Sequence, residues 1–335
     1  MGVAPGIREA VRDQLTGGCD LAMLLCPVMG RGAFSHQSRE GTPMVPTPDS
    51  AANPPGSSIS FEPASTYFDG EEWKHRTNCS SLKELDKSPV AYQRRYIAGT
   101  APIQDHPAFA YGTLLHKWGE LLDGLDGDPF WDRAKIAPAQ CVTATGQFGK
   151  LSAEWLASLA AEDIPVSPSD YTKLKDQTEQ ILANRAAAEI LANATHKEFN
   201  IKFQIGDHDC KCRVDLATES GFADFKSTRD AAPDETFQYA VRDFKYDLQA
   251  AFYLYGGMAA GWPRHTMKFI ATSTTYPYHC AVMTLPPIAL REAELRILAL
   301  IKELEKRRAL DWWTPSHYGQ VIEMPARFFT PRKAW

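Results

Sequence analysis

One stretch of alternating apolar and polar residues limits the folds open to this chain. On either side of a turn at residues 206–209, apolar side chains occupy every second position: Phe199, Ile201, Phe203, Ile205, then Cys210, Cys212, Val214 and Leu216. A period of two is the spacing of a strand with one buried face. A second turn at 217–221 precedes another apolar segment at 222–227. The pattern predicts three consecutive strands joined by short turns.

Helical periodicity surrounds these strands. Before them, apolar spacing predicts helices at 80–92, with Ser80 or Ser81 as the N-cap, and at 108–122 and 171–193. After them it predicts helices at 235–260 and 290–304, separated by two strands at 267–274 and 278–285. The predicted order is helices, three strands, helix, two strands, helix, which is an α/β chain.

The N-terminal part of the chain has a different composition. Residues 27–65 are rich in Pro, Gly and Ser and lack hydrophobic periodicity. We therefore expect residues 1–65 to form a disordered or weakly structured tail and residues 66–335 to form the folded domain. The sequence has no apolar run of about eighteen residues and no leader pattern, so we expect a soluble, cytoplasmic protein without membrane contact.

Charge and cysteine usage exclude two classes of protein. A formal net charge of -5 does not suit a protein that coats DNA nonspecifically, so any DNA contact must be a local, positively lined channel. The seven cysteines are scattered, and His208, Cys210 and Cys212 lack a second pair at zinc-ligand spacing. We expect reduced cysteines that pack in the core.

The predicted strands bring together groups that suit phosphodiester hydrolysis. Asp224 and Lys226 are two residues apart and share one face, and Asp215 on the preceding strand can turn towards Asp224 across the hairpin. Two carboxylates bind Mg²⁺, with Mn²⁺ as a substitute, and a lysine orients or deprotonates a metal-bound water.

The alternative is a solvated ion-pair cluster on an exposed sheet face. An Asp-x-Lys triplet alone is weak evidence, since Asp209-Cys210-Lys211 and Asp243-Phe244-Lys245 have the same form. Neither of those triplets has an acid placed like Asp215 on an adjoining strand.

Several motifs, in order, resemble a known family. Their sequences are Cys210-Lys-Cys-Arg-Val-Asp215, Phe222-Ala-Asp-Phe-Lys-Ser-Thr228, Tyr246-Asp-Leu-Gln-Ala-Ala-Phe-Tyr253, Ser80-Ser-Leu-Lys-Glu-Leu-Asp-Lys-Ser-Pro-Val-Ala-Tyr92, Gly112-Thr-Leu-Leu-His116 and Trp313-Thr-Pro-Ser-His-Tyr318 with Met324-Pro325. Together they resemble the nuclease domain of RecE-type exonuclease VIII from prophages and, more distantly, RecB-like nucleases and lambda exonuclease. This resemblance spans residues 78–328. It implies the PD-(D/E)XK nuclease fold, with a central mixed sheet flanked by helices.

The resemblance also implies roles for individual residues. Asp215 and Asp224 would be metal ligands, Lys226 the catalytic lysine, and His116 a further ligand, although a lone helical histidine taken by itself favours a core residue. Glu198 is a candidate for the same metal site, with a solvated strand-edge glutamate as the alternative. The helix face formed by Tyr246, Gln249 and Tyr253 is a candidate for substrate contact, although the tyrosines are equally core residues with polar tips. On position alone, Arg213 and the loop from Thr228 to Asp230 are candidates for phosphate contact.

The implied activity is a metal-dependent, ATP-independent exodeoxyribonuclease. It would digest one strand of linear duplex DNA from the 5′ end and leave 3′ overhangs for recombination by a single-strand annealing partner. Relatives act as homo-oligomeric rings threaded by DNA, and the compartment would be the cytoplasm of a bacterial or phage-infected cell. The alternatives are a structure-specific or single-strand nuclease of the same superfamily and a DNA-binding scaffold that does not hydrolyse.

Overall fold

The computed structural model describes residues 57–102, 107–123, 129–144 and 146–314. Its centre is a mixed sheet of six strands in the order β1-β4-β5-β6-β7-β8, in which β6 and β7 are parallel and all other neighbours are antiparallel. The strands are β1 (Ser58–Ser60), β4 (His196–Ile205), β5 (His208–Ala217), β6 (Gly221–Thr228), β7 (Thr266–Ser273) and β8 (Cys280–Thr284). The predicted meander and the two later strands are therefore confirmed.

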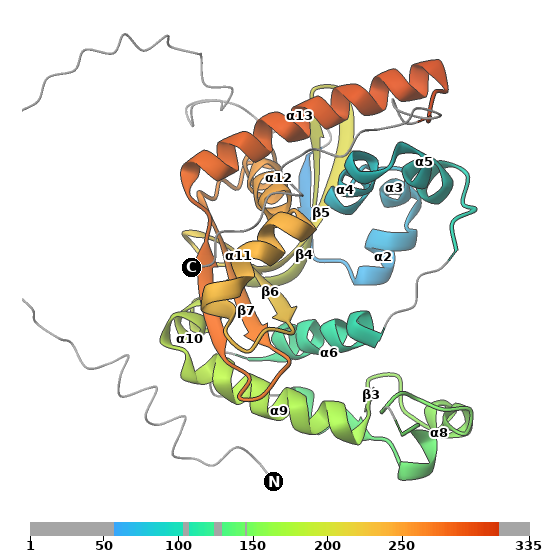
Figure 1. The fold of residues 1–335 in the computed structure, drawn as a ribbon, viewed down its shortest axis with the longest axis vertical. Coiled ribbons are helices and arrows are strands. Elements are labelled where there is room, and N and C mark those ends of the chain that lie inside the picture. The colour runs from blue at the N-terminus through green and yellow to red at the C-terminus, as the bar shows by residue number, and fades with distance from the viewer. Residues whose placement is uncertain (1–56, 103–106, 124–128, 145, 315–335) are drawn as a thin grey trace, which may run out of the picture.

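Helices cover both faces of this sheet (Figure 1). One face carries α4 (Cys79–Lys87), α5 (Pro89–Tyr92), α11 (Pro233–Phe244), α12 (Tyr246–Ala259) and α13 (Pro287–Leu310). The other carries α6 (Pro107–Leu121), α7 (Pro129–Arg133), α9 (Pro168–Ala183) and α10 (Arg185–Ala192). Each face has its own apolar core, because the alternating residues of the strands point to opposite sides. None of the helices in the described ranges is long and apolar enough to cross a bilayer.

Smaller elements lie at the edges of the fold. These are α2 (Ala64–Asp69), α3 (Glu71–Lys74), the π-helical turn η1 (Gln93–Ile97), the short helices η2 (Ala139–Cys141) and α8 (Ser152–Ala157), and the two-stranded parallel pair β2 (Ala134–Ile136) and β3 (Ile164–Val166). Sequence periodicity did not identify them, since each is too short to show a repeat.

The N-terminal boundary of the folded domain lies earlier than the sequence predicts. Ser58–Ser60, placed in the tail on composition, is instead an edge strand that pairs with β4, with Ile59 opposite Ile201. The side-chain amide of Asn200 also donates to the carbonyl of Glu62 at 3.0 Å. Residues 1–56, and the motif residues Tyr318, Met324 and Pro325, lie outside the described residues.

Local capping explains where the structure departs from the predicted helices. The N-cap of α4 is Asn78, whose side chain accepts from Ser81 N–H in a capping box, so neither Ser80 nor Ser81 is the cap. The predicted helix at 171–193 is two helices, because Asn184 ends α9 and caps α10. Similarly, Lys245 adopts a left-handed conformation with φ of 52° and separates α11 from α12.

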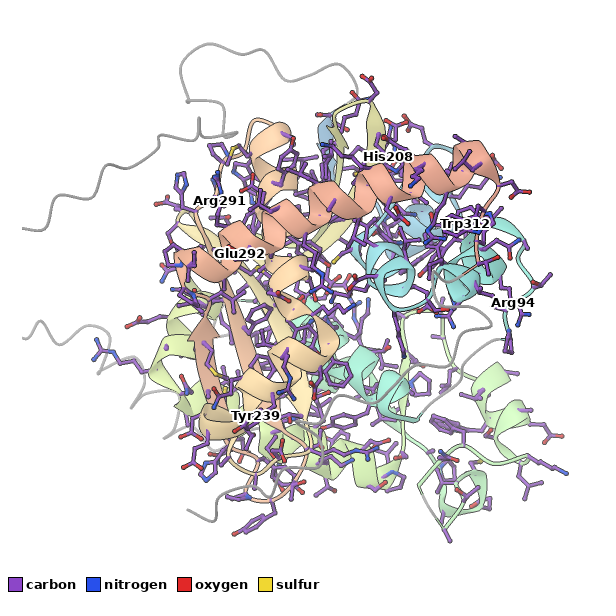
Figure 2. All side chains as sticks on the ribbon, turned by 45° about the horizontal axis from the view of Figure 1, so that its top comes forward. Arg94, His208, Tyr239, Arg291, Glu292 and Trp312 are labelled. Carbon is purple, nitrogen blue, oxygen red and sulfur yellow. The ribbon has the colours of Figure 1, made fainter. Side chains whose placement is uncertain are left out.

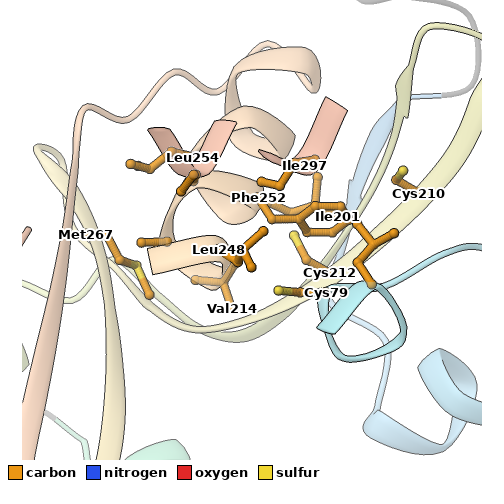
Figure 3. Close-up of a cluster of buried hydrophobic side chains, with 14 of the residues drawn as sticks. Cys79, Ile201, Cys210, Cys212, Val214, Leu248, Phe252, Leu254, Met267 and Ile297 are labelled. Carbon is orange, nitrogen blue, oxygen red and sulfur yellow. The ribbon is translucent and has the colours of Figure 1, made fainter. Parts of the chain in front are cut away.

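Four of the cysteines in the described residues are buried, and Cys280 is partly buried. Cys79, Cys210 and Cys212 are buried in the apolar core beneath α12, beside Ile201 and Phe252 (Figure 3). His208 lies beside α13, where its ring is hydrogen-bonded to the Thr77 hydroxyl at 2.7 Å (Figure 2). Through these contacts, His208, Cys210 and Cys212 take part in the packing between β5 and the neighbouring elements.

Helix α6 approaches the sheet closely at one glycine. A Cβ on Gly119 would lie 2.4 Å from the ring of Phe225 on β6. We expect Gly119→Ala to lower the free energy of unfolding by about 1–3 kcal/mol, because the added methyl overpacks a buried contact. Chemical denaturation measures this change.

Gly112→Ala is the matched control on the same helix. A Cβ at Gly112 meets nothing within 4 Å. This substitution should stabilise the protein by roughly 0.5–1 kcal/mol, the usual gain from replacing a mid-helix glycine. Equal stability of the two variants would show that the α6–β6 distance does not depend on Gly119.

Candidate active site

The site forms where two antiparallel strands stop pairing. The β5–β6 ladder contains only Leu216↔Ala223 and Ala217↔Phe222, and beyond it the strands diverge. Asp215 and Asp224 are the next residues on each strand. The N–H of Phe225 donates to Asp215 Oδ2 at 2.9 Å, so a carboxylate satisfies a backbone group that has no ladder partner on β5.

The alternation of faces along β5 breaks at the same point. Val214 packs in the core beneath α12, whereas Leu216 packs in the core beneath α6. The predicted common face for these two residues is therefore wrong. The register of β4 and β5 places Glu198 opposite Asp215, and Glu198 has a φ of 46°. A left-handed, non-glycine residue inside a strand is strained, and such strain is concentrated at functional sites.

Three potential metal ligands converge beside this irregularity. His116 projects from α6, and its Nδ1 lies 3.1 Å from Asp215 Oδ2 and 3.6 Å from Glu198 Oε1. The three ligand atoms lie within 4.8 Å of one another. Two oxygens bound to one Mg²⁺ are separated by at most about 4.2 Å, since each bond is 2.0–2.1 Å. The donor set therefore fits a divalent cation after small side-chain movements.

Asp224 and Lys226 share a face, as period-two geometry predicts. The Lys226 ammonium contacts Asp224 Oδ2, and Gln249 on α12 donates from Nε2 to Asp224 Oδ1 at 2.6 Å. The Lys226 ammonium also lies 4.9 Å from the ring centre of Tyr246. Asp224 is only 1% exposed, whereas the side chain of His116 is 34% exposed and is therefore the more accessible of the two.

Burial and neighbouring charges move the pKa of each acid. Burial raises the pKa of Asp224, and the nearby Asp215 carboxylate raises it further. Burial also raises the pKa of Glu198, against the lowering effect of His116. Burial opposes ionisation of Asp215 too, but His116, Lys226 and the Phe225 N–H outweigh it and lower its pKa.

The two basic groups respond to the same acids. Burial alone would lower the pKa of Lys226, but Asp224 and Asp215 more than compensate and raise it. Burial likewise disfavours the charged form of His116, and Asp215 outweighs it, so its pKa rises well above the ordinary value. The cluster is thus a set of paired charges rather than a solvated surface patch, the alternative left open by the sequence.

Arg213 holds Glu198 in place. Its Nε donates to Glu198 Oε2 at 2.8 Å, and its Nη1 donates to Asn200 Oδ1 at 2.9 Å and to the carbonyl of Glu62 at 3.3 Å. The sequence suggested a phosphate contact for Arg213. These bonds give the guanidinium a positioning role, and Glu62 and Asn200, which sequence reasoning missed, complete its surroundings.

Two other predicted residues lie around the cluster. The Thr228 hydroxyl, at the end of β6, accepts from Asp230 N–H at 3.3 Å and so stabilises the following loop. Tyr253 lies one helical turn after Gln249, and burial raises its pKa well above the ordinary value, with a further contribution from Asp224. Substrate contacts by these residues stay predictions.

Sequence reasoning missed Lys83 as part of the site. Lys83 projects from α4, and its ammonium lies 5.1 Å from the ring centre of Tyr246, the ring that Lys226 also faces. Its position within the Ser80–Tyr92 motif was the available signal. The apolar spacing of α4 does not indicate that the side of the helix carrying Lys83 lies next to α12.

Comparisons with known proteins identify the family and support the fold. The model of a PDDEXK-like domain of unknown function (DUF3799) matches residues 78–317. No curated protein matches. Among solved structures, a "Putative exonuclease" from Eubacterium rectale is similar at 12% identity with a TM-score of 0.54, covering 79% of this chain and 95% of that chain. At this identity the structural likeness supports the fold alone.

We expect the cluster to bind one or more divalent cations. Titration of the protein with Mn²⁺ in a calorimeter should show a binding site. Asp215→Asn should raise the Kd of this site at least about tenfold, because the loss of one anionic ligand costs at least about 1.4 kcal/mol of binding free energy. The same cation should raise the melting temperature of the unmodified protein, because a ligand that binds only the folded state stabilises it.

Asp243→Asn provides the control for charge removal. Asp243 belongs to another Asp-x-Lys triplet, but it is exposed and pairs only with Arg242 in the part of the chain described by the structure. Its substitution should leave Mn²⁺ affinity unchanged. An equal loss in both variants would mean that the titration reports net charge rather than a built site.

Proposed function

We propose, from the premise that this chain belongs to the PDDEXK-like domain family, that it is a divalent-metal-dependent deoxyribonuclease. The observation that carries the proposal is the convergence of His116, Glu198 and Asp215 at the β5–β6 divergence, with Asp224 and Lys226 beside them. Carboxylates, an imidazole and an ammonium around one point suit hydrolysis of a phosphodiester.

The residues of the site divide into three roles. His116, Glu198, Asp215 and Asp224 would hold the cation, which supplies an activated water and neutralises charge on the phosphoryl oxygens. Lys226, held by Asp224 and kept protonated by the two acids, would orient that water through its N–H groups and offset negative charge in the transition state. Arg213 and Gln249 would position Glu198 and Asp224 through the bonds described above.

The finer proposal concerns the substrate and the products. We propose an ATP-independent exonuclease that uses Mg²⁺, degrades one strand of duplex DNA from the 5′ end and leaves 3′ overhangs for recombination. A homo-oligomeric ring and a single-strand annealing partner belong to the same proposal. The ordered motifs from Ser80 to Tyr253 support it, and a ring would let a chain of net charge -5 hold DNA with local positive charge.

Degradation of linear duplex DNA tests the proposed chemistry. Wild-type protein should degrade DNA with Mg²⁺ and not with EDTA, without ATP. Asp224→Asn should reduce the rate by at least about a hundredfold, because a metal-binding charge disappears while Oδ1 can still accept from Gln249. Circular dichroism should show an unchanged fold. Undiminished digestion by this variant, in a preparation free of host nucleases, would refute the assignment.

End-labelled duplexes test the polarity. A 5′ label should be released early as a mononucleotide or short product, while a 3′ label on the same strand should stay in long fragments. Release of both labels at equal rates, or cleavage only at junctions or single strands, would favour the structure-specific or single-strand nuclease. Binding without any cleavage would favour the scaffold.

A further inference from the structure

The ring of Tyr246 contacts the candidate catalytic lysine, a second lysine and an exposed aromatic ring. Lys226 Nζ is 4.9 Å from its centre and Lys83 Nζ is 5.1 Å from it. On the α11 side, the ring of Phe244 stacks on Tyr246 with centroids 5.7 Å apart and planes at 28°. A cationic and aromatic surface therefore begins beside Lys226 and continues to α11.

Lys83 carries a charge that the fold does not neutralise. Among the described residues, no carboxylate lies within ion-pair distance of its ammonium, whereas Lys245 and Arg296 nearby both pair with Asp86. Burial lowers the pKa of Lys83, and the neighbouring Lys226 lowers it further. A half-buried cation next to another cation is costly unless an anion joins them, and the anion that matches a nuclease site is a backbone phosphate.

Phe244 presents an aromatic face to solvent at the other end of this surface. It is the last residue of α11 and is 61% exposed, although it stacks on a ring that is itself packed against Phe237 and Phe269. That packing holds the Tyr246 ring, and through it the stacked position of Phe244, against the core. Rigid exposed aromatic rings are the surfaces on which unpaired bases stack.

We propose that Lys83, Tyr246 and Phe244 form a nucleotide subsite next to Lys226, in which Lys83 binds a backbone phosphate and Phe244 stacks on an unpaired base. This inference rests on the proposed nuclease function and adds the form of its substrate. The strand entering the site is unpaired at the nucleotide that contacts Phe244. Tyr246 supports the subsite by fixing the distance between the phosphate-binding and base-binding groups.

Fluorescence of 2-aminopurine tests the stacking step without catalysis. The probe is a 5′-phosphorylated duplex with 2-aminopurine at each of the first three positions in turn, bound to Asp224→Asn protein with Mg²⁺. Binding should quench the fluorescence at one position, and adding Phe244→Ala should remove the quench and weaken binding by about 5- to 150-fold. Absence of quenching at all three positions, or quenching that survives Phe244→Ala, would overturn the proposal.

Tyr239→Ala is the matched control for Phe244. Tyr239 (Figure 2) is also an aromatic residue on α11 and is 55% exposed, but its ring faces the guanidinium of Arg242 rather than the ring of Tyr246. Removing it should leave both the quench and the affinity unchanged. Loss of the quench with Tyr239→Ala as well would show a general effect of α11 surface aromatics and would count against the subsite.

Salt dependence tests the phosphate contact. Lys83→Gln should reduce the slope of log K against log[salt] by roughly 1, the effect of losing one phosphate contact, and Lys83→Arg should restore it. Lys87→Gln, an exposed lysine one turn later on α4, should leave the slope unchanged. An unchanged slope in Lys83→Gln would remove Lys83 from the subsite.

A substrate cycle separates failure of the subsite from failure of the proposed function. In wild-type protein, an abasic site at the quenched position should slow cleavage, and Phe244→Ala should abolish the difference between abasic and normal DNA. If wild-type protein cleaves DNA and the abasic site slows cleavage by the same factor in wild-type and Phe244→Ala protein, the subsite proposal is wrong. The nuclease proposal is then unaffected. If wild-type protein cleaves nothing, the nuclease proposal fails, and the fluorescence result still decides the stacking.

Discussion

The early end of the β5–β6 ladder is the constraint on which the site depends. Strand β6 pairs with β7 along its whole length, so it stays in the sheet after it leaves β5. The opening between the two strands receives Asp215 and Asp224, and the Phe225 N–H binds a side chain instead of a neighbouring strand. Because α6 meets β6 at Gly119 and Phe225, His116 is carried over the same opening.

Charge pairing explains how so many ionisable groups share a buried place. Arg213 holds Glu198, His116 faces Asp215, and Lys226 contacts Asp224, so each acid has its own cation. A buried charge without a partner costs several kcal/mol, and pairs with further hydrogen bonds offset much of that cost. Lys83 has no such acid partner among the described residues. Its unpaired charge therefore supports the proposal that a phosphate of the substrate binds there.

Local pattern predicted the order of strands and helices, whereas the resemblance to a known family implied the PD-(D/E)XK fold. Period-two alternation predicted the meander and put Asp224 and Lys226 on one face, and the structure confirms both. The same pattern failed at Leu216, because both faces of the sheet are covered by apolar cores and an apolar residue is compatible with either one. It also placed Ser58–Ser60 outside the domain, since three residues are too few to show a period.

The sequence by itself determined the strands, their order and the acids on them, because these depend on residues two to four positions apart. Only the tertiary structure decided which distant groups meet those acids. His116 and Lys83 lie about a hundred residues or more before Asp215 and Asp224, and they reach the site through the packing of α6 and α4. Helix periodicity identifies a buried face but not the element that covers it. The left-handed turn at Glu198 has the same origin, since its strain depends on contacts that form only in the folded chain.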